Sequence, residues 1–187
     1  MNRKLLYPRN MAICSLFTAL IAIGAFIQIP VPMNDYFTLQ FFFVLLAGLL
    51  LGSRLGSLSV IIYVLIGLIG IPIFAAGGGL AYIVRPSFGY LLGFIVTAFM
   101  TGYICEKSTM TGLKKYALAI VVGLLCTYVI GIMYKYLILN YYVGEPISLT
   151  LVLLSCFPLD LPGDIFLSCV ALLTAKRLEP MKGKWNL

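Results

Sequence analysis

Long apolar runs occupy most of the sequence, and they restrict the chain to folds that span a membrane. The runs cover residues 11–29, 37–52, 57–71, 86–105, 116–139 and 149–175. The chain is 62% hydrophobic and 10% charged, whereas soluble domains carry roughly 25% charged residues. A membrane-spanning helix needs about 20 apolar residues, so the second and third runs are short. We therefore expect one all-α domain, residues 1–187, forming a polytopic membrane protein with a bundle of six transmembrane helices.

The first apolar run follows a short basic segment, as the apolar region of a signal peptide would. It is longer than the roughly 7–15 residues of such a region, and it ends in the proline-broken segment 29–36 without a small-residue cleavage site. We expect a retained first helix.

The basic residues give the expected orientation. All but two of the 13 lie at the N-terminus, near Arg54, in the loop 107–115 or in the C-terminal tail. Basic residues concentrate on the cytoplasmic side of membrane proteins, so both termini should be cytoplasmic. The exceptions are Arg85 and Lys135. Because the charges flank spans, the net charge of +7 does not indicate a nucleic-acid partner.

Two residue types argue against several kinds of chemistry. The chain has no histidine, the commonest general base and metal ligand. Its five cysteines are scattered singly, without a CxxC pair. We expect no metal site, no redox site and no cofactor.

A glycine-rich segment between two apolar runs, residues 72–94, is the first candidate site. It contains Gly77, Gly78 and Gly79, the aromatic residues Phe74, Tyr82 and Tyr90, and Arg85 directly before a proline. Short spans followed by an irregular segment mark ligand sites in transporters. A plain loop between two spans is the alternative.

Two aspartates in the last apolar run form the second candidate site. Asp160 and Asp164 are four residues apart and would share one helix face, although Pro162 and Gly163 should bend the helix between them. Carboxylates within a span cost several kcal/mol unless paired or wetted, and they usually mark a substrate pathway. An Arg85–aspartate pair that only locks two helices together is the alternative.

Together these residues suit a small organic acid with a polar heterocycle. Arg85 could bind a carboxylate, the aspartates could accept hydrogen bonds from ring N–H groups, and the aromatic residues could cover the ring. Asn34 and Gln40 could add polar contacts, although the pattern favours an ordinary loop or helix-end role for either residue alone. The candidate ligand-binding residues are Asn34, Gln40, Phe74, Gly77, Gly78, Gly79, Tyr82, Arg85, Tyr90, Asp160 and Asp164.

Small residues recur at four-residue spacing in the first helix, where they permit close helix approach. Ser15 pairs with Ala19, and Thr18 pairs with Ala22. They would serve either internal packing or the docking of a partner.

Three stretches resemble the biotin-specific S components of energy-coupling factor (ECF) transporters, the BioY family. They are IPVP at 29–32, IGIPIFAAGGGLAYIVRPSFGYLLGF at 69–94 and PGD at 162–164. The resemblance implies a six-helix membrane subunit that binds biotin as its transported substrate near the outer face. It also implies an ECF module, formed by a transmembrane T subunit and two ATPases, that docks on small residues of the first helix.

The sequence departs from the family pattern at two places. Many relatives read GPTGGY where this chain reads RPSFGY at 85–90, and many carry a lysine shortly after PGD, where this chain has Ile165, Phe166 and Leu167. We hypothesise that Arg85 supplies the cation that this lysine would otherwise give.

Several functions compete with biotin capture. An S component or a secondary carrier for another small vitamin is the nearest alternative. An intramembrane enzyme with Asp160 and Asp164 as an acid–base pair, or a purely structural scaffold, is less favoured. The chain lacks a GxxxxGKS nucleotide-binding loop, and we expect it to catalyse nothing.

Overall fold

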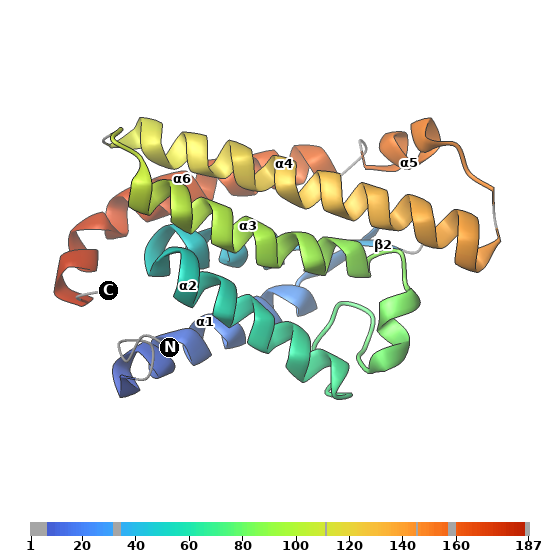
Figure 1. Ribbon diagram of the computed structural model, residues 1–187, viewed down its shortest axis with the longest axis horizontal. Coiled ribbons are helices and arrows are strands. Elements are labelled where there is room, and N and C mark those ends of the chain that lie inside the picture. The colour runs from blue at the N-terminus through green and yellow to red at the C-terminus, as the bar shows by residue number, and fades with distance from the viewer. Residues whose placement is uncertain (1–6, 32–34, 111, 145, 157–159, 186–187) are drawn as a thin grey trace.

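The computed structural model describes residues 7–31, 35–110, 112–144, 146–156 and 160–185. It is a mostly helical bundle with a two-stranded sheet at one end (Figure 1). The elements are α1 (Pro8–Phe26), β1 (Gln28–Val31), β2 (Asp35–Thr38), α2 (Gln40–Leu68), the 3-10 helix η2 (Leu80–Val84), α3 (Phe88–Lys107), α4 (Leu113–Leu137), the π-helix η3 (Ile138–Val143), α5 (Leu149–Ser155) and α6 (Asp160–Trp185).

A β-hairpin replaces the loop that the sequence predicts after the first helix. β1 and β2 are antiparallel, with Gln28 opposite Thr38 and Pro30 opposite Tyr36. Proline is tolerated here because a strand at a sheet edge has no ladder partner on its outer side. The expectation of an all-α chain is therefore wrong at this point, and the next helix begins at Gln40 instead of residue 37.

The predicted second and third helices are the two arms of α2. Gly52 interrupts the helix with φ 83° and ψ −179°, a conformation that favours glycine. In a straight helix, residues 40 and 63 would lie about 35 Å apart. Instead Gln40 Nε2 donates a hydrogen bond of 2.7 Å to the Tyr63 hydroxyl, so the arms are antiparallel.

α3 packs along α2 on one side and along α4 on the other (Figure 1). Small and hydroxylated residues allow the α3–α4 approach. Thr97 Oγ1 lies 2.7 Å from the Gly123 carbonyl oxygen and 2.6 Å from Thr127 Oγ1. These contacts fix the register of the two helices.

The last predicted run is divided into α5 and α6, whose axes differ by 49°. The break precedes Asp160, so both aspartates lie in the first turns of α6. The expected bend between them is therefore wrong. Pro162 causes none because the first turn of a helix needs no hydrogen bond from its N–H.

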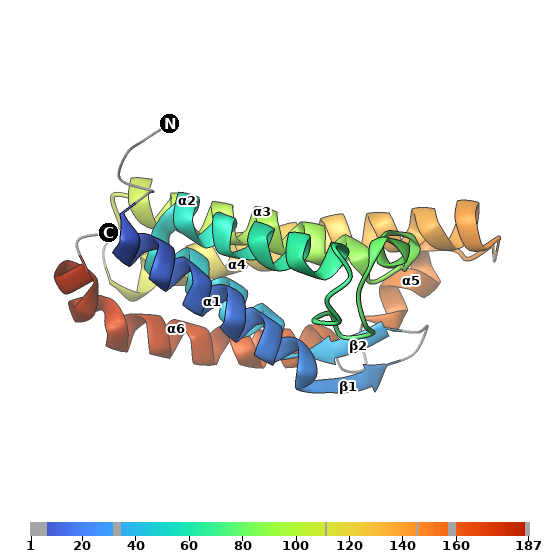
Figure 2. The same ribbon diagram turned by 90° about the horizontal axis from the view of Figure 1, so that it is seen from below.

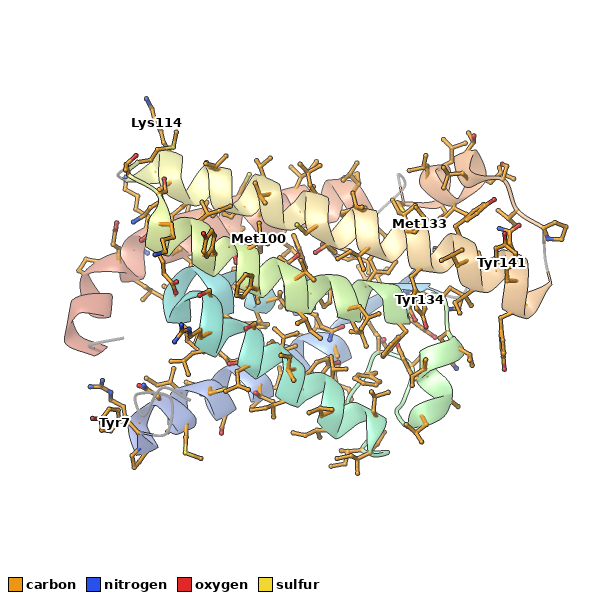
Figure 3. All side chains as sticks on the ribbon, in the orientation of Figure 1. Tyr7, Met100, Lys114, Met133, Tyr134 and Tyr141 are labelled. Carbon is orange, nitrogen blue, oxygen red and sulfur yellow. The ribbon has the colours of Figure 1, made fainter. Side chains whose placement is uncertain are left out.

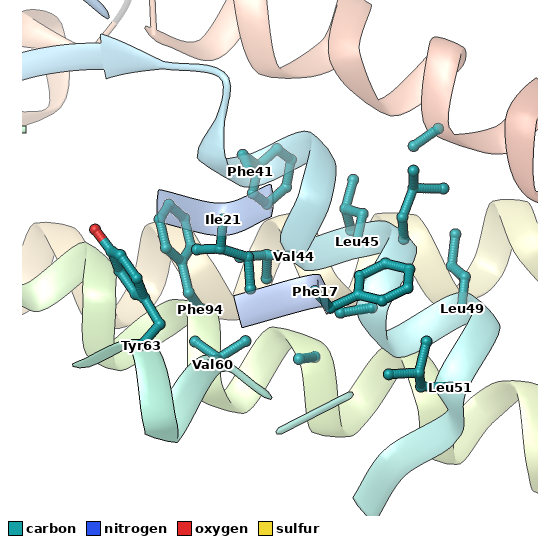
Figure 4. Close-up of a cluster of buried hydrophobic side chains, with 14 of the residues drawn as sticks. Phe17, Ile21, Phe41, Val44, Leu45, Leu49, Leu51, Val60, Tyr63 and Phe94 are labelled. Atoms are coloured by element: carbon teal, nitrogen blue, oxygen red, sulfur yellow. The ribbon is translucent and has the colours of Figure 1, made fainter. Parts of the chain in front are cut away.

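Among the described residues, four helices are long and apolar enough to cross a membrane, and there are five such spans if α5 and α6 count as one. This count is lower than the six predicted because it takes α2 as one helix, although its two arms run antiparallel on either side of Gly52. The buried aliphatic and aromatic side chains of α1, α2 and α3 form a common core (Figure 4). α6 runs along the side of the bundle opposite α3 (Figure 2).

Candidate functional site

A pocket lies at the end of the bundle where the β-hairpin and η2 gather (Figures 1 and 2). It holds about 560 Å³ of space, counting the part open to solvent. Its walls come from β2, the start of α2, the η2 region, α3, α4 and the start of α6. The lining residues are Tyr36, Phe37, Thr38, Gln40, Phe41, Ala75, Tyr82, Ser87, Tyr90, Leu91, Phe94, Thr127, Tyr128, Asp160 and Asp164.

Two carboxylates lie on one side of this pocket. Asp160 and Asp164 are each only 9% exposed, and the Tyr128 hydroxyl of α4 donates a hydrogen bond of 2.9 Å to Asp164 Oδ2. Both aspartates lie near the N-terminus of α6, where the helix dipole favours negative charge. The pair therefore offers hydrogen-bond acceptors to a ligand with N–H donors.

The side-chain amide of Gln40 forms another part of the pocket lining. Gln40 begins α2 and is 3% exposed. Its Oε1 accepts a hydrogen bond from Thr38 Oγ1 at 3.2 Å, and its Nε2 donates to Tyr63. Gln40 is thus held from two sides.

Aromatic side chains form the remaining walls. The Tyr90 ring meets the Tyr128 ring edge-on at 6.2 Å, and Tyr82 packs on Phe74 with ring centroids 4.6 Å apart. Gly163 lets β2 approach α6, since a Cβ there would lie 2.5 Å from the Phe37 ring. Such walls suit a small apolar ring with a few polar atoms.

The η2 region is tied to the helices beside it. The Tyr134 hydroxyl of α4 donates a hydrogen bond to the Ile83 carbonyl, and Figure 3 shows Tyr134 where α4 passes η2. The glycines shape the chain leading into η2: Gly77 and Gly79 have φ of 109° and 96°, and a Cβ on Gly78 would lie 2.4 Å from the Ile71 carbonyl oxygen. These glycines support the pocket wall without lining it.

The structure thus brings together Gln40, Tyr82, Tyr90, Asp160 and Asp164 from the predicted residues. Phe74 lies behind Tyr82. Arg85 is exposed, outside the lining, with its guanidinium carbon 5.5 Å from the Tyr82 ring centroid. Asn34 lies outside the described residues.

The sequence reasoning missed several lining residues, above all Tyr128. Thr127 and Tyr128 are polar side chains in a mostly apolar run, which was the available signal. Two helical turns further along α4 lies Lys135, which is 0% exposed. A buried cation in a span is also a functional signal.

The four small residues of α1 lie on different faces. Thr18 is buried, with its hydroxyl 3.0 Å from the carbonyl oxygens of both Cys14 and Ser59, and Ala22 packs against the core. Ser15 and Ala19 are exposed. Within the described residues, no three His, Cys, Asp or Glu side chains gather to hold a metal.

Comparison with known proteins gives consistent matches. A sequence model of the BioY family matches residues 1–184. The chain is 39% identical over 169 residues to the probable biotin transporter BioY of Lysinibacillus sphaericus, covering 90% of this chain and 86% of that protein. It is 38% identical over 175 residues to the probable biotin transporter BioY of Pyrococcus horikoshii, covering 91% and 96%.

A solved structure has the same fold. The crystal structure of the S component for biotin from an ECF-type ABC transporter matches with a TM-score of 0.80 and 24% identity. The match covers 96% of this chain and 94% of that chain.

Proposed function

This chain belongs to the BioY family, and we propose that it is the biotin-binding subunit of an ECF-type transporter. It is a membrane transport protein and not an enzyme. The observation that carries the choice of ligand is the pair of buried carboxylates, Asp160 and Asp164, facing a pocket with aromatic walls. Relatives with the name biotin transporter BioY match most of this chain.

The pocket chemistry complements biotin. The cyclic urea of biotin carries two N–H donors, and Asp160 and Asp164 provide acceptors on one wall. Tyr82, Tyr90 and the other rings cover the apolar part of the bicycle. High affinity follows from burying that part while the few polar atoms remain hydrogen-bonded.

The carboxylate of biotin then points out of the pocket toward η2. Arg85 lies at this rim, beside Tyr82. A guanidinium can bind a carboxylate through two parallel hydrogen bonds. Arg85 is therefore the proposed carboxylate partner.

The proposed orientation places six crossings in the membrane with both termini in the cytoplasm. α1 begins and α6 ends at the same end of the bundle (Figure 2), and the basic loop at Lys114 lies at that end as well, far from Tyr141 (Figure 3). The pocket lies at the opposite end and would face outward, as capture of an external vitamin requires.

The proposed partner is an ECF module, formed by a transmembrane T subunit and two ATPases that drive inward release. Of the α1 small residues, Ser15 and Ala19 are exposed and can contact a partner. Thr18 and Ala22 face the interior of the subunit. The docking face is therefore assigned to Ser15 and Ala19.

Isothermal titration of the purified full chain with biotin tests the ligand. We expect a dissociation constant below micromolar and no comparable heat with a panel of other small vitamins. Absence of biotin binding at micromolar concentrations would overturn the proposal. Tighter binding of another vitamin would favour an S component for that vitamin.

A further inference from the structure

The Tyr63 hydroxyl joins the side-chain amide of Gln40 to the segment before η2. Tyr63 lies on the second arm of α2, is 0% exposed and does not line the pocket. Its hydroxyl donates a hydrogen bond of 3.0 Å to the Ile73 carbonyl oxygen. Figure 4 shows Tyr63 at one end of the core cluster, with its hydroxyl directed away from the labelled aliphatic side chains.

The hydrogen bond to Ile73 determines whether the Tyr63 hydroxyl acts as donor or acceptor toward Gln40. A phenol has one proton, and a carbonyl oxygen can only accept, so the proton of Tyr63 is committed to Ile73. Toward Gln40 the hydroxyl presents a lone pair. The Gln40 group that lies 2.7 Å away must therefore be the amide NH₂.

The opposite end of the Gln40 amide is fixed as well. Its Oε1 accepts from Thr38, which lines the pocket. The oxygen of Gln40 thus lies on the pocket side and the nitrogen on the Tyr63 side. An amide without such partners could turn over and exchange the two.

We infer that Tyr63 is a specificity-determining positioning residue that keeps the Gln40 oxygen, instead of its NH₂, toward the ligand. This rests on the proposed function, and it adds a third acceptor to the two carboxylates. A pocket with three acceptors selects a ligand with N–H donors, such as a cyclic urea, over an analogue with an alkylated nitrogen. This selection is strong because an analogue that lacks the N–H donors leaves buried acceptors of the pocket without hydrogen bonds.

The phenylalanine variant isolates the hydroxyl. The Tyr63 ring packs edge-on against Phe74 at 5.4 Å, and Phe74 supports Tyr82 in the pocket wall. Tyr63→Phe keeps this ring and removes only the oxygen. Tyr116→Phe is the matched control, because Tyr116 is 1% exposed at the start of α4 and does not line the pocket.

We expect Tyr63→Phe to weaken biotin binding about 10-fold, as the loss of one buried hydrogen bond implies. It should also reduce the preference for biotin over biotins methylated at either ureido nitrogen. In a Gln40→Ala background the same substitution should change affinity less than about twofold, since interacting residues show non-additive effects. Tyr116→Phe should leave the affinity and the preference unchanged.

A second readout needs no ligand. The chain has two glutamines, Gln28 and Gln40, so selective ¹⁵N labelling gives two pairs of side-chain NH₂ signals, assigned through Gln40→Ala. We expect slow hydrogen exchange of the Gln40 amide in the unaltered chain and faster exchange in Tyr63→Phe. Unchanged exchange, unchanged affinity, or an equal affinity loss in the Gln40→Ala background would each overturn the inference. Absence of biotin binding by the unaltered chain would overturn the proposed function instead, and the amide signals would still report on Tyr63.

Discussion

The Tyr128 hydroxyl and the Asp164 carboxylate are 2.9 Å apart and join α4 to α6 at the pocket. The phenol occupies one acceptor position of the carboxylate and directs the others. Because a carboxylate has about four lone-pair sites, Asp164 keeps acceptor capacity for a ligand. The contact therefore orients the Asp164 carboxylate and leaves acceptor positions available to a ligand.

Asp164→Asn should weaken biotin binding about 100-fold, because hydrogen bonds to a charged acceptor contribute about 1.5–3 kcal/mol. Tyr128→Phe should weaken it less, about 10-fold, because the carboxylate remains. Titration calorimetry of the purified variants measures both. Tyr103→Phe is the control, since Tyr103 is exposed on α3. A larger loss in Tyr128→Phe than in Asp164→Asn would contradict this assignment of roles.

The partner of the biotin carboxylate can be identified by comparing two cations. Arg85→Met should lower affinity for biotin up to about fivefold, the range for an exposed ion pair, and leave affinity for the neutral biotin amide unchanged. Lys135→Met removes the buried cation and is the matched comparison. If Lys135→Met, but not Arg85→Met, loses the preference for biotin over the neutral biotin amide, then Lys135 binds the biotin carboxylate.

The helices were predictable because each apolar run is bounded by charges, prolines or glycines. Glu106 and Lys107 end one helix, and Gly112 precedes the next. The β-hairpin was not predictable, because Pro30 normally argues against a strand, and only edge pairing with Tyr36 makes it acceptable.

Those site residues were predictable that are charged and lie within an apolar, membrane-spanning run. Asp160 and Asp164 stand out in an apolar run, and both line the pocket. The position of Arg85 depends on which way the chain turns after η2, and the sequence does not specify this. Tyr128 was missed because its few polar neighbours in the mostly apolar α4 do not mark an inward face, which is set by packing against α3 and α6.

The turn between the α2 arms gives a prediction about stability. Glu106 accepts hydrogen bonds from the Ser53 backbone N–H at 2.7 Å and from Ser53 Oγ at 2.9 Å, next to the φ 83° of Gly52. Glu106→Ala should lower the free energy of unfolding by about 1–3 kcal/mol, because a buried donor loses its partner. Thermal unfolding in detergent measures this.

The control for that stability prediction is Ser57→Ala. Within the described residues, Ser57 Oγ is hydrogen-bonded only to the Ser53 and Arg54 carbonyls of its own helix, so its loss should have little effect. Biotin affinity should be unchanged in both variants, since the α2 turn lies away from the pocket. A stability loss in Ser57→Ala equal to that in Glu106→Ala would rule out a specific role for the carboxylate.

The exposed face of α1 gives the last prediction, on coupling to the ATPases. Ala19→Trp should abolish ATP-driven biotin uptake in cells that express the ECF module, because a large side chain prevents close helix approach. Titration with biotin should show unchanged affinity. Leu125→Trp is the control, since Leu125 is 55% exposed on α4 and should tolerate the change in lipid. Full uptake in Ala19→Trp would place the docking face elsewhere on the subunit, whereas loss of biotin affinity would show that α1 supports the pocket instead of the partner.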